Sequence, residues 1–494
     1  MQIPFDNRYV TLGENFFDRT HPTPVKQPEL IKFNDALASE LGISTDQVAA
    51  SGAAVFSGNT LPEGAEPLAM AYAGHQFGHF SPQLGDGRAL LLGEINRPDG
   101  ARVDIHLKGS GRTAFSRSGD GRSALGPVLR EYLVSEAMHK LNVPTTRALA
   151  AVTTGEPVAR ERMLPGGVIT RVASSFVRVG TFEYFATRDD VAAVKQLADY
   201  VIEKSYPQLG EHNNPYVALL KAVVERLAAL IAQWMHIGFI HGVMNTDNMS
   251  ISGETIDYGP CAFMDAYHHN QVFSSIDRQG RYAYSNQPSI GLWNLVRLAE
   301  ALLPLFDEDP QAAVDNAQDV LKGYQQRYES DWLAGMQEKC GLTARSDAAG
   351  DDDKALIEAL LDVMADNHAD FTLTFYHLSR LADESSAQDN DLRSLFDNPA
   401  PIDAWLTKWR QRLSLETQGK EARQEAMQAV NPVYIPRNHQ IEAAIRAAED
   451  HGDFSVFHAL HDVLQDPYAL QAGKESYMQA PQPEEVVEYT FCGT

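Results

Sequence analysis

Apolar residues recur every three or four positions in three long segments of the chain. This spacing predicts amphipathic helices, each with one buried face, at Pro28–Leu41, Leu125–Leu141 and Pro215–Ile237. The last pattern is the clearest, because apolar residues continue from Leu220 to Trp234 and Gly238 then supplies a stop signal.

Shorter patterns of a different period predict strands around the second of these helices. Ala89–Leu92 is apolar throughout, as in a buried strand, and Val103–Lys108 alternates, as in a half-buried strand. Residues 147–172 predict short strands joined by turns at Thr154-Gly155 and Pro165–Gly167. We therefore expect a sheet in the N-terminal part of the chain.

From about Asp189 onward the pattern becomes helical. After Pro215–Ile237, further helices are predicted at Trp293–Phe306, Ala312–Tyr328, Asp352–Leu381, Ile402–Leu413, Ser414–Val430 and Gln440–His451. The acidic stretch Ser346–Asp353 is predicted to be a solvated linker. The order of elements indicates an α+β protein with an α-rich C-terminal region.

Composition narrows the class of protein. The 494 residues are 44% hydrophobic and 22% charged, as in a soluble globular protein with more than one packed unit. The net charge of −25 disfavours general binding to nucleic acid or to anionic membranes. No apolar run of about 18 residues is present, and the start lacks the features of a secretion signal or transit peptide. We expect a cytoplasmic protein without a nucleic-acid or membrane partner.

The strongest chemical signal follows the third predicted helix. The segments Asn248–Ser252 and Thr255–Tyr258 are predicted to form a hairpin, which would hold Asn248 close to the carboxylate of Asp257. Oxygen ligands of this kind suit a hard cation such as Mg²⁺ that also binds water and phosphate. The metal-binding half of a protein-kinase site has the same two residue types.

One position departs from the protein-kinase pattern. In kinases the base aspartate precedes the metal-binding asparagine by five residues, and here that position is Val243, which cannot accept a proton. The only nearby carboxylate in the loop is that of Asp247, next to Asn248. The sequence thus predicts a metal site without the usual base.

Candidate phosphate-binding groups occur in the N-terminal part. Gly85 and Gly87 permit a tight turn before a strand, and Arg88 follows them, so the turn is either an anion site or a plain β-turn. The loop Gly109–Arg122 crowds Arg, Gly and hydroxyl residues into an acidic protein. Guanidinium groups and free backbone N–H groups suit phosphate recognition, although a flexible surface loop has a similar composition.

Three further basic residues have two interpretations each. Lys108 ends its strand like the phosphate-binding lysine of kinases, or is simply solvated, and its helix partner is Glu131 or Glu136, between which spacing does not decide. Arg171 and Arg178 are surface charges or triphosphate ligands.

Several motifs together resemble the selenoprotein O family, whose members are protein adenylyltransferase pseudokinases. The motifs are Tyr72–Gly78, Gln83–Glu94, Leu107–Arg122, Ile240–Gly259, Asn431–Asn438 and the C-terminal Cys492. Some members of the family carry selenocysteine near the C-terminus, where this chain has Cys492. No function for Asn431–Asn438 follows from its residues.

The resemblance implies a protein-kinase-like two-lobed fold with an enlarged α-rich C-terminal lobe. Residues 1–186 would form the N-terminal extension and N-lobe, and residues 187–494 the C-lobe with its C-terminal tail. ATP would bind flipped relative to ordinary kinases, so that AMP is transferred to Ser, Thr or Tyr hydroxyls of proteins and pyrophosphate is released. The alternatives are a kinase-type transfer of the γ-phosphoryl group and an inactive nucleotide-binding scaffold.

The resemblance also implies roles for individual residues. Asp247 would accept the proton, Lys108 would pair with Glu131 and contact phosphate, and Asn248 and Asp257 would hold Mg²⁺ or Mn²⁺. The nucleotide would be lined by Gly85, Gly87, Arg88, Lys108, Asp120, Gly121, Arg171, Arg178 and Asp257.

The cysteines suggest a separate, redox-dependent feature. Cys261, Cys340 and Cys492 match no zinc pattern and are too few for a disulfide scaffold. Cys261 is either a small buried apolar residue or one end of a tether to Cys492, which would fix the tail across the loop after the metal site.

Overall fold

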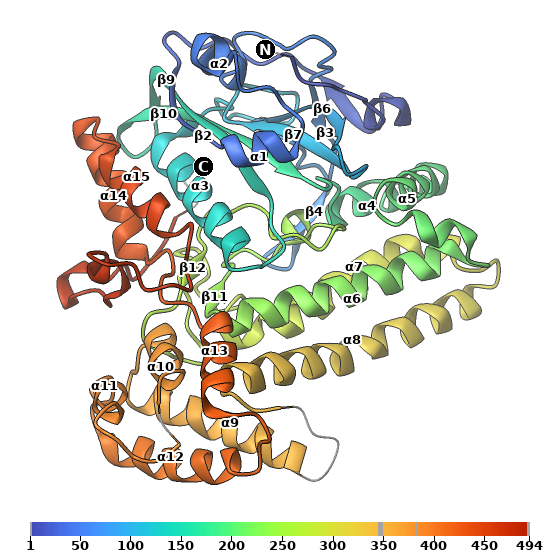
Figure 1. The fold of residues 1–494 in the computed structure, drawn as a ribbon. Coiled ribbons are helices and arrows are strands. Elements are labelled where there is room, and N and C mark those ends of the chain that lie inside the picture. The colour runs from blue at the N-terminus through green and yellow to red at the C-terminus, as the bar shows by residue number, and fades with distance from the viewer. Residues whose placement is uncertain (1, 344–348, 382, 492–494) are drawn as a thin grey trace.

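The computed structural model describes residues 2–343, 349–381 and 383–491. The protein is of the α+β class: the main sheet is built from the N-terminal part of the chain, and the C-terminal part is largely helical (Figure 1). Within the described residues, no helix combines the length and apolar character needed to cross a membrane.

The main sheet is antiparallel in all its pairings, with the order β1-β3-β6-β7-β10-β9-β2 and β8 paired to β10. Its strands are β1 (Phe17–Arg19), β2 (Glu29–Phe33), β3 (Leu68–Met70), β6 (Ala89–Asn96), β7 (Arg102–Lys108), β8 (Ser123–Ala124), β9 (Arg147–Ala159) and β10 (Met163–Ala173). Two small ribbons, β4 (Gly74–Gln76) with β5 (His79–Ser81) and β11 (Phe239–Ile240) with β12 (Ala262–Phe263), lie outside it.

Helices cover both faces of this sheet. On one face α1 (Asp35–Glu40) and α2 (Val48–Phe56) contact β9, and on the other α3 (Leu125–Lys140) contacts β9 and β10. Alternate residues of β10 accordingly enter different cores, with Val168 on the side of α2 and Ile169 on the side of α3.

Two C-terminal helices enclose α3 from outside. These are α14 (Asn438–His451) and α15 (Ser455–Val463), which both contact α3 and lie beside it in Figure 1. Arg130 of α3 donates to Glu442 of α14 over 2.7 Å. The helix that carries Glu131 is therefore held between the sheet and the C-terminal end of the chain.

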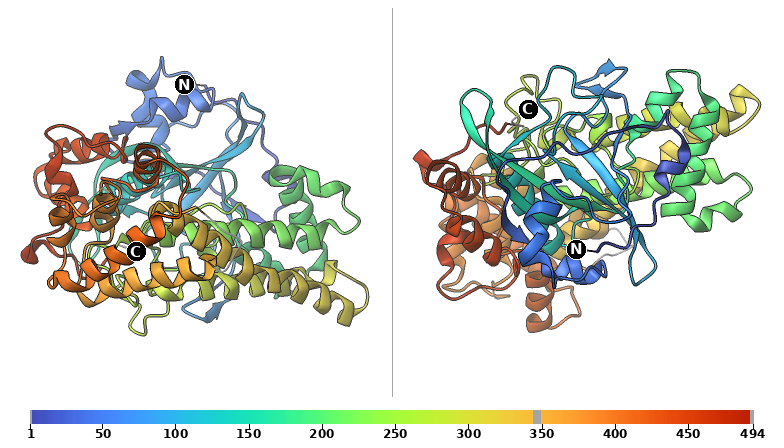
Figure 2. Two further views of the ribbon diagram at one scale, coloured as in Figure 1. Left: turned by 60° about the horizontal axis from the view of Figure 1, so that its bottom comes forward. Right: turned by 90° about the horizontal axis from the view of Figure 1, so that it is seen from above.

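The helical part begins after β10. Its remaining helices are α4 (Val179–Ala186), α5 (Val191–Ser205), α6 (Pro215–His236), α7 (Gln287–Leu302), α8 (Pro310–Lys339), α9 (Ala349–Asp366), α10 (Phe371–Leu378), α11 (Asp389–Arg393), α12 (Pro399–Leu413) and α13 (Lys420–Val430). Short 3-10 turns occur at Tyr9–Leu12, Pro207–Glu211, Thr246–Asn248, Tyr284–Asn286, Leu303–Leu305, Glu475–Met478 and Pro483–Glu485. Helices α6 and α8 run side by side in all views, so the apolar stripe of α6 is buried (Figure 2).

The predicted helix at Pro28–Leu41 is wrong for its first half. That half forms β2, which pairs with β9, and only Asp35–Glu40 is helical. The side chain of Asn34 caps this short helix by accepting a hydrogen bond from Leu37 N–H over 3.0 Å. The apolar pattern of the first half fits the period of a strand as well as that of a helix, and pairing with the distant strand β9 decides between them.

The short strands predicted within residues 147–172 are instead two long strands. The chain turns at Arg160, whose N–H donates to the carbonyl of Arg162 over 3.0 Å. The predicted turn at Pro165–Gly167 is a register shift between β10 and β9. Glycine there marks an irregular ladder and not the end of a strand.

Helix boundaries in the C-terminal region also differ from the predictions. The predicted helix Asp352–Leu381 is two helices, α9 and α10, and the second begins at Phe371, after Asp370, whose side chain caps it. The predicted linker Ser346–Asp353 is wrong at its end, because Asp353 is buried in α9 and lies 2.6 Å from Arg412 Nε. Residues 344–348 of that stretch lie outside the described residues.

The motif Asn431–Asn438 has a structural role. The buried guanidinium of Arg437 contacts the carboxylates of Asp265 and Asp370 and donates to the carbonyl of Met478 over 2.9 Å. Asn431 accepts a hydrogen bond from the buried Lys339 over 2.8 Å. The motif thus ties the C-terminal segment to the chain that follows β12.

Candidate active site

A cavity of 640 Å³ lies between the sheet and the loop that follows β11. It is lined by all the residues predicted to bind nucleotide or metal, namely Gly85, Gly87, Arg88, Lys108, Asp120, Gly121, Arg171, Arg178, Asn248 and Asp257, and by Asp247. Glu131 is buried next to Lys108. The structure therefore brings together residues that are up to 172 positions apart in the sequence, from Gly85 to Asp257.

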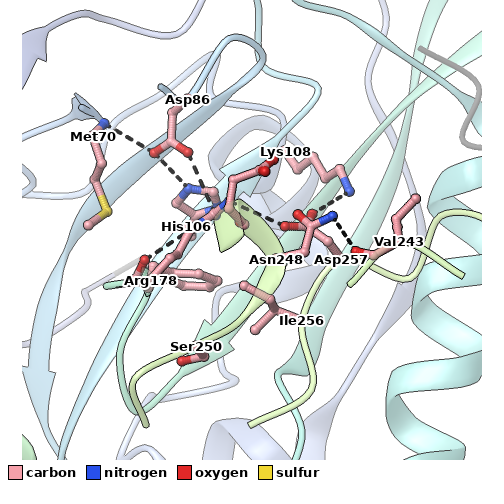
Figure 3. A network of polar contacts seen from close by, with 12 residues as sticks. Met70, Asp86, His106, Lys108, Arg178, Val243, Asn248, Ser250, Ile256 and Asp257 are labelled. Atoms are coloured by element: carbon pink, nitrogen blue, oxygen red, sulfur yellow. Dashed lines mark hydrogen bonds and ion pairs between the residues drawn. The ribbon is translucent and has the colours of Figure 1, made fainter. Parts of the chain in front are cut away.

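Two carboxylates and two cations form the buried centre of the site. Lys108 Nζ lies 2.8 Å from Glu131 Oε2 and 3.1 Å from Asp257 Oδ1. Arg171 contacts the same two residues, with Nε 2.5 Å from Glu131 Oε1 and Nη2 2.6 Å from Asp257 Oδ1. Each carboxylate is thus held by a lysine and an arginine from adjacent strands β7 and β10 (Figure 3 shows Lys108 with Asp257).

The partner of Lys108 is Glu131 and not Glu136. Residues five apart on a helix are separated by about 140° around its axis, so only one of the two can face Lys108. Glu136 points to the other side of α3, where its Oε1 lies 2.9 Å from Arg147 Nε.

Arg178 adds a third cation to this centre. Its Nη1 donates to Asp257 Oδ2 over 3.3 Å and to the main-chain carbonyl of Asp247 over 3.0 Å. Its guanidinium carbon lies 4.5 Å from the centroid of the Tyr72 ring, in a cation–π contact. Asp86 lies 3.8 Å from the same guanidinium.

Asp86 is a site residue that the sequence reasoning missed. Its buried carboxylate accepts hydrogen bonds from Met70 N–H over 3.1 Å and lies 3.2 Å from His106 Nε2 (Figure 3). Asp86 stands between Gly85 and Gly87, and a residue in that position is typical of a tight turn whatever its side chain does. The available signal was an acidic residue two positions before Arg88 in the same glycine turn.

The local charges keep the central carboxylates ionised. Burial alone would raise the pKa of Asp257, but the charges of Arg171, Lys108 and Arg178 outweigh it and hold that pKa well below its usual range. Burial also opposes ionisation of Glu131, and Arg171 and Lys108 again lower its pKa. Both groups are therefore negative at neutral pH.

The loop after β11 positions Asn248. Its Nδ2 donates to the carbonyl of Val243 over 3.0 Å, which fixes the orientation of the amide. The amide oxygen is then the atom that could bind a metal ion. Val243 thus contributes its backbone to the site at the position where kinases have a base. His241, fully buried, lies with Nε2 2.9 Å from the carbonyl of Ile256 and joins the loop to the segment of Asp257.

The predicted hairpin between Asn248 and Asp257 is reduced to one antiparallel bridge, between Met249 and Thr255. Asn248 belongs to a 3-10 turn and not to a strand. The flanking backbone pairs elsewhere, since Ser250 bridges to Arg178 and Thr255 to Thr145. The prediction of a regular hairpin is therefore wrong, although both residues line one cavity.

Asp247 differs from the other carboxylates of the site. The residue is 7% exposed, its Oδ2 accepts a hydrogen bond from Gln76 Nε2 over 3.2 Å, and its Oδ1 is buried with no hydrogen-bond partner. Burial raises its pKa to about 6. A carboxylate with such a pKa is mostly ionised at neutral pH and remains basic enough to accept a proton.

The glycine turn and the arginine-rich loop pack against each other. A Cβ on Gly85 would lie 2.2 Å from the ring of Phe115, and one on Gly87 would lie 2.9 Å from the Phe115 carbonyl oxygen. Thr113 Oγ1 donates to the carbonyl of Asp86 over 2.6 Å. Glycine is therefore required at both positions for the loop Gly109–Arg122 to cover the turn.

The loop ends at the rim of the cavity. Gly121 has a φ of +69°, and a Cβ there would overlap the Gly111 backbone. The carboxylate of Asp120 lies 2.9 Å from Arg160 Nη1, and this pair is partly exposed. Arg160 follows β9, so the ion pair connects the loop to the β9–β10 turn.

The donor set suits a divalent metal held jointly with a nucleotide. No group of three or more His, Cys, Asp or Glu side chains that could hold a metal occurs in the part of the chain that the structure describes. Asn248 and Asp257 supply an amide and a carboxylate oxygen, and Mg²⁺ characteristically binds one or two protein ligands together with substrate phosphates and water. The residues present therefore fit such an ion.

The C-terminal tail lies beside the end of the same loop. Thr490 Oγ1 donates to the carbonyl of Pro260 over 2.5 Å, and Thr490 N–H donates to the carbonyl of Phe273 over 2.8 Å. The neighbouring Cys261 is buried. Cys492, the other end of the predicted tether, lies outside the described residues.

Comparison with known proteins gives a consistent result over the chain. A family model described as "Protein adenylyltransferase SelO" matches residues 1–465. The chain is 60% identical to a "Protein nucleotidyltransferase YdiU" of Rhizobium johnstonii, over 100% of this chain and 97% of that protein. Proteins of the same name from Rhizobium meliloti (58% identity, 99% of each chain) and a Bradyrhizobium species (57% identity, 100% of each chain) are similar to it over the same extent.

Proposed function

The chain belongs to the protein adenylyltransferase SelO family, and from that premise we propose that it transfers AMP from ATP to Ser, Thr or Tyr hydroxyls of proteins and releases pyrophosphate. The observation that carries this proposal is the position of Asp247. Its buried carboxylate has an oxygen without a partner and lines the same cavity as Lys108, Asn248 and Asp257. A proton acceptor and a phosphate-binding centre therefore face one space.

The reaction needs positioning and charge compensation more than covalent help from the protein. A protein hydroxyl attacks the α-phosphorus of ATP, the bond to the β-phosphate oxygen breaks, and pyrophosphate leaves with the bonding electrons. Asp247 accepts the hydroxyl proton as the new P–O bond forms. Its pKa of about 6 makes it ionised and ready to do so at neutral pH.

The cations of the site would bind the departing pyrophosphate. Lys108, Arg171 and Arg178 meet at Asp257 within 3.3 Å, and Arg88 lines the same cavity. Guanidinium and ammonium groups held in place by buried carboxylates stabilise negative charge without having to reorganise during the reaction. Gly85, Gly87, Asp120 and Gly121 would shape the wall against which the nucleotide lies.

Asn248 and Asp257 would hold Mg²⁺ or Mn²⁺ with the nucleotide. When bound, the ion would supply further neutralisation of phosphate charge. The fixed amide of Asn248 and the ionised carboxylate of Asp257 support this assignment.

We further infer a protein-kinase-like arrangement, with an N-lobe in residues 1–186 and a C-lobe in residues 187–494. Its support is the sequence of parts: a strand lysine, a helix glutamate that binds it, and a later loop with an asparagine and an aspartate. In that frame, ATP lies flipped, with its α-phosphate toward Asp247. The cytoplasmic location stays a prediction.

The second candidate is a kinase-type transfer of the γ-phosphoryl group with Asp247 as base. An inactive nucleotide-binding scaffold is the third, and the complete set of cations and carboxylates in the cavity argues against it. Parallel incubations with α-³²P-ATP and γ-³²P-ATP separate all three. AMP transfer leaves the α label on protein, kinase activity leaves the γ label, and a scaffold leaves neither.

A redox tether between Cys261 and Cys492 is proposed as a control of this activity. The docking of Thr490 against Pro260 supports it, because it brings the tail beside the residue that precedes Cys261. If the tether forms, the activity of the wild-type protein differs between oxidising and reducing buffer, and Cys492→Ser abolishes that difference. An unchanged difference in the variant would refute the tether.

A further inference from the structure

The segment Tyr72–Gly78 has no assigned role, although it carries one of the sequence motifs. It contains β4, which lies between the main sheet and the helical part and lines the active-site cavity (Figure 1). We propose that Gln76 of this segment is a positioning residue that holds the carboxylate of Asp247 in its reactive orientation. This inference rests on the proposed function of Asp247 as the proton acceptor.

Three consecutive residues of the segment bind three consecutive residues, Asn245, Thr246 and Asp247, of the loop after β11. The N–H of His75 donates to Thr246 Oγ1 over 2.7 Å, and that of Phe77 donates to Asn245 Oδ1 over 3.1 Å. Between them, the side chain of Gln76 donates to Asp247 Oδ2 over 3.2 Å. The contact of Gln76 is thus one part of a continuous interface between the two segments.

Within the part of the chain that the structure describes, the hydrogen-bond donor to the Asp247 carboxylate is Gln76. Arg178 approaches the same residue, but it donates to the main-chain carbonyl and not to the carboxylate. Because Oδ2 is bound by Gln76, the carboxylate cannot rotate freely, and Oδ1 is left without a protein partner. Oδ1 is buried and packs against Gly74, so both oxygens of the carboxylate are held in place.

Two glycines lie close to Asp247. A Cβ on Gly74 would lie 2.6 Å from Asp247 Oδ1, and a Cβ on Gly180 would lie 3.4 Å from the Asp247 Cα. The glycines thus let β4 approach the carboxylate and the start of α4 approach the backbone of Asp247.

The segment itself is held from two helices, as a positioning element must be. His75 Nδ1 lies 2.5 Å from Glu183 of α4, and its ring lies edge-on to Trp293 of α7 with 5.2 Å between centroids. Phe77 N–H also donates to Tyr282 OH over 3.1 Å, which in turn donates to Asn245 Oδ1 over 2.6 Å. These contacts fix His75 and Phe77 on either side of Gln76, and they thereby keep the side chains of Gln76 and Asp247 within a narrow range of positions.

The test compares Gln76→Leu with Gln83→Leu, a matched change at an exposed glutamine just beyond β5. Leucine keeps the bulk of Gln76 and removes its donor. We expect Gln76→Leu to lower kcat roughly tenfold and to leave the KM for ATP within about twofold of wild type, because the lost orientation affects the proton acceptor and not nucleotide binding. Gln83→Leu is expected to match wild type in both constants, and the unfolding temperatures of all three proteins are compared.

A second arm shows whether Gln76 acts through Asp247. In the background Asp247→Asn, the change Gln76→Leu should lower the residual rate less than twofold, because the group that it positions is gone. A tenfold further loss in that background, or an unchanged kcat in Gln76→Leu alone, would overturn the inference.

The wild-type control separates this inference from the proposed function. If the wild-type protein transfers no α label to protein, both the proposed function and this inference are wrong. The inference alone is wrong if the wild-type protein transfers the α label, Asp247→Asn does not, and Gln76→Leu transfers it at the full wild-type rate.

Discussion

Arg171 Nη2 lies 2.6 Å from Asp257 Oδ1, and the same guanidinium contacts Glu131 through Nε. A residue of the sheet therefore joins the helix α3 to the segment of Asp257, beyond the loop that follows β11. Two carboxylates that belong to different parts of the chain are placed by one rigid, planar group. This geometry leads to the first prediction.

Replacement of Arg171 by lysine should not preserve function. A lysine offers a single ammonium group and cannot contact Glu131 and Asp257 in the same fork geometry. We expect Arg171→Lys to reduce the rate of AMP transfer by roughly 100-fold. Initial rates of α-label incorporation measure the effect. Arg327→Lys, at an exposed ion pair on α8, is the control and should behave as wild type.

Asp257→Asn should uncouple nucleotide binding from the metal. The change removes the negative charge that three cations share, so a free ATP anion would meet a more positive cavity. Titration of a fluorescent ATP analogue should show binding that no longer strengthens when Mg²⁺ is added, and AMP transfer should fall by roughly 100-fold or more. Retained activity with Mg²⁺ would refute the metal assignment.

The two glutamates of α3 offer a matched pair of variants. Glu131→Gln removes a partner of Lys108 and Arg171 and should lower AMP transfer by roughly 100-fold. Glu136→Gln weakens the contact with Arg147 and should lower the unfolding temperature while transfer stays within about threefold of wild type. Comparable losses of activity in both variants would show that α3 as a whole, and not the pair with Lys108, is what the reaction needs.

The neutral state of His241 predicts a loss of stability in acid. Burial lowers its pKa to about 4 from an ordinary 6.5. Between these values the unfolded chain binds the proton and the folded chain does not, so stability falls as the pH decreases from 6.5 toward 4. For this group the loss at pH 5 is about 2 kcal/mol.

The variant His241→Gln measures this contribution. Glutamine can still donate to the carbonyl of Ile256 but does not bind a proton. The difference in unfolding free energy between pH 7.5 and pH 5 should therefore be smaller in the variant by about 2 kcal/mol. An equal difference in both proteins would show that His241 does not titrate in this range.

The elements that local pattern determines could be predicted from the sequence. The helix α6 follows its apolar stripe, and the strand β7 ends at Lys108 as predicted, although it is buried from Val103 to Lys108 and not half-buried. Asn248 and Asp257 line one cavity as predicted, although the regular hairpin from which their proximity was predicted does not form.

Features that depend on distant partners could not be predicted in the same way. The residues Leu30 to Phe33 fit a helix as well as a strand, and only the pairing with β9 decides between them. Asp353 lies in an acidic stretch that resembles a linker, and its burial depends on Arg412, which lies 59 residues later. Gln76 acquires its role through Asp247, at a separation of 171 residues. No local periodicity carries such information.

The orientation of ATP in the cavity is the central claim. A crystal structure with a non-hydrolysable ATP analogue and Mg²⁺ measures it most directly. We predict that the α-phosphate lies nearest to Asp247 and that the outer phosphates contact Lys108, Arg171 and Arg178. A γ-phosphate next to Asp247, with the adenine in the orientation of ordinary kinases, would contradict the account.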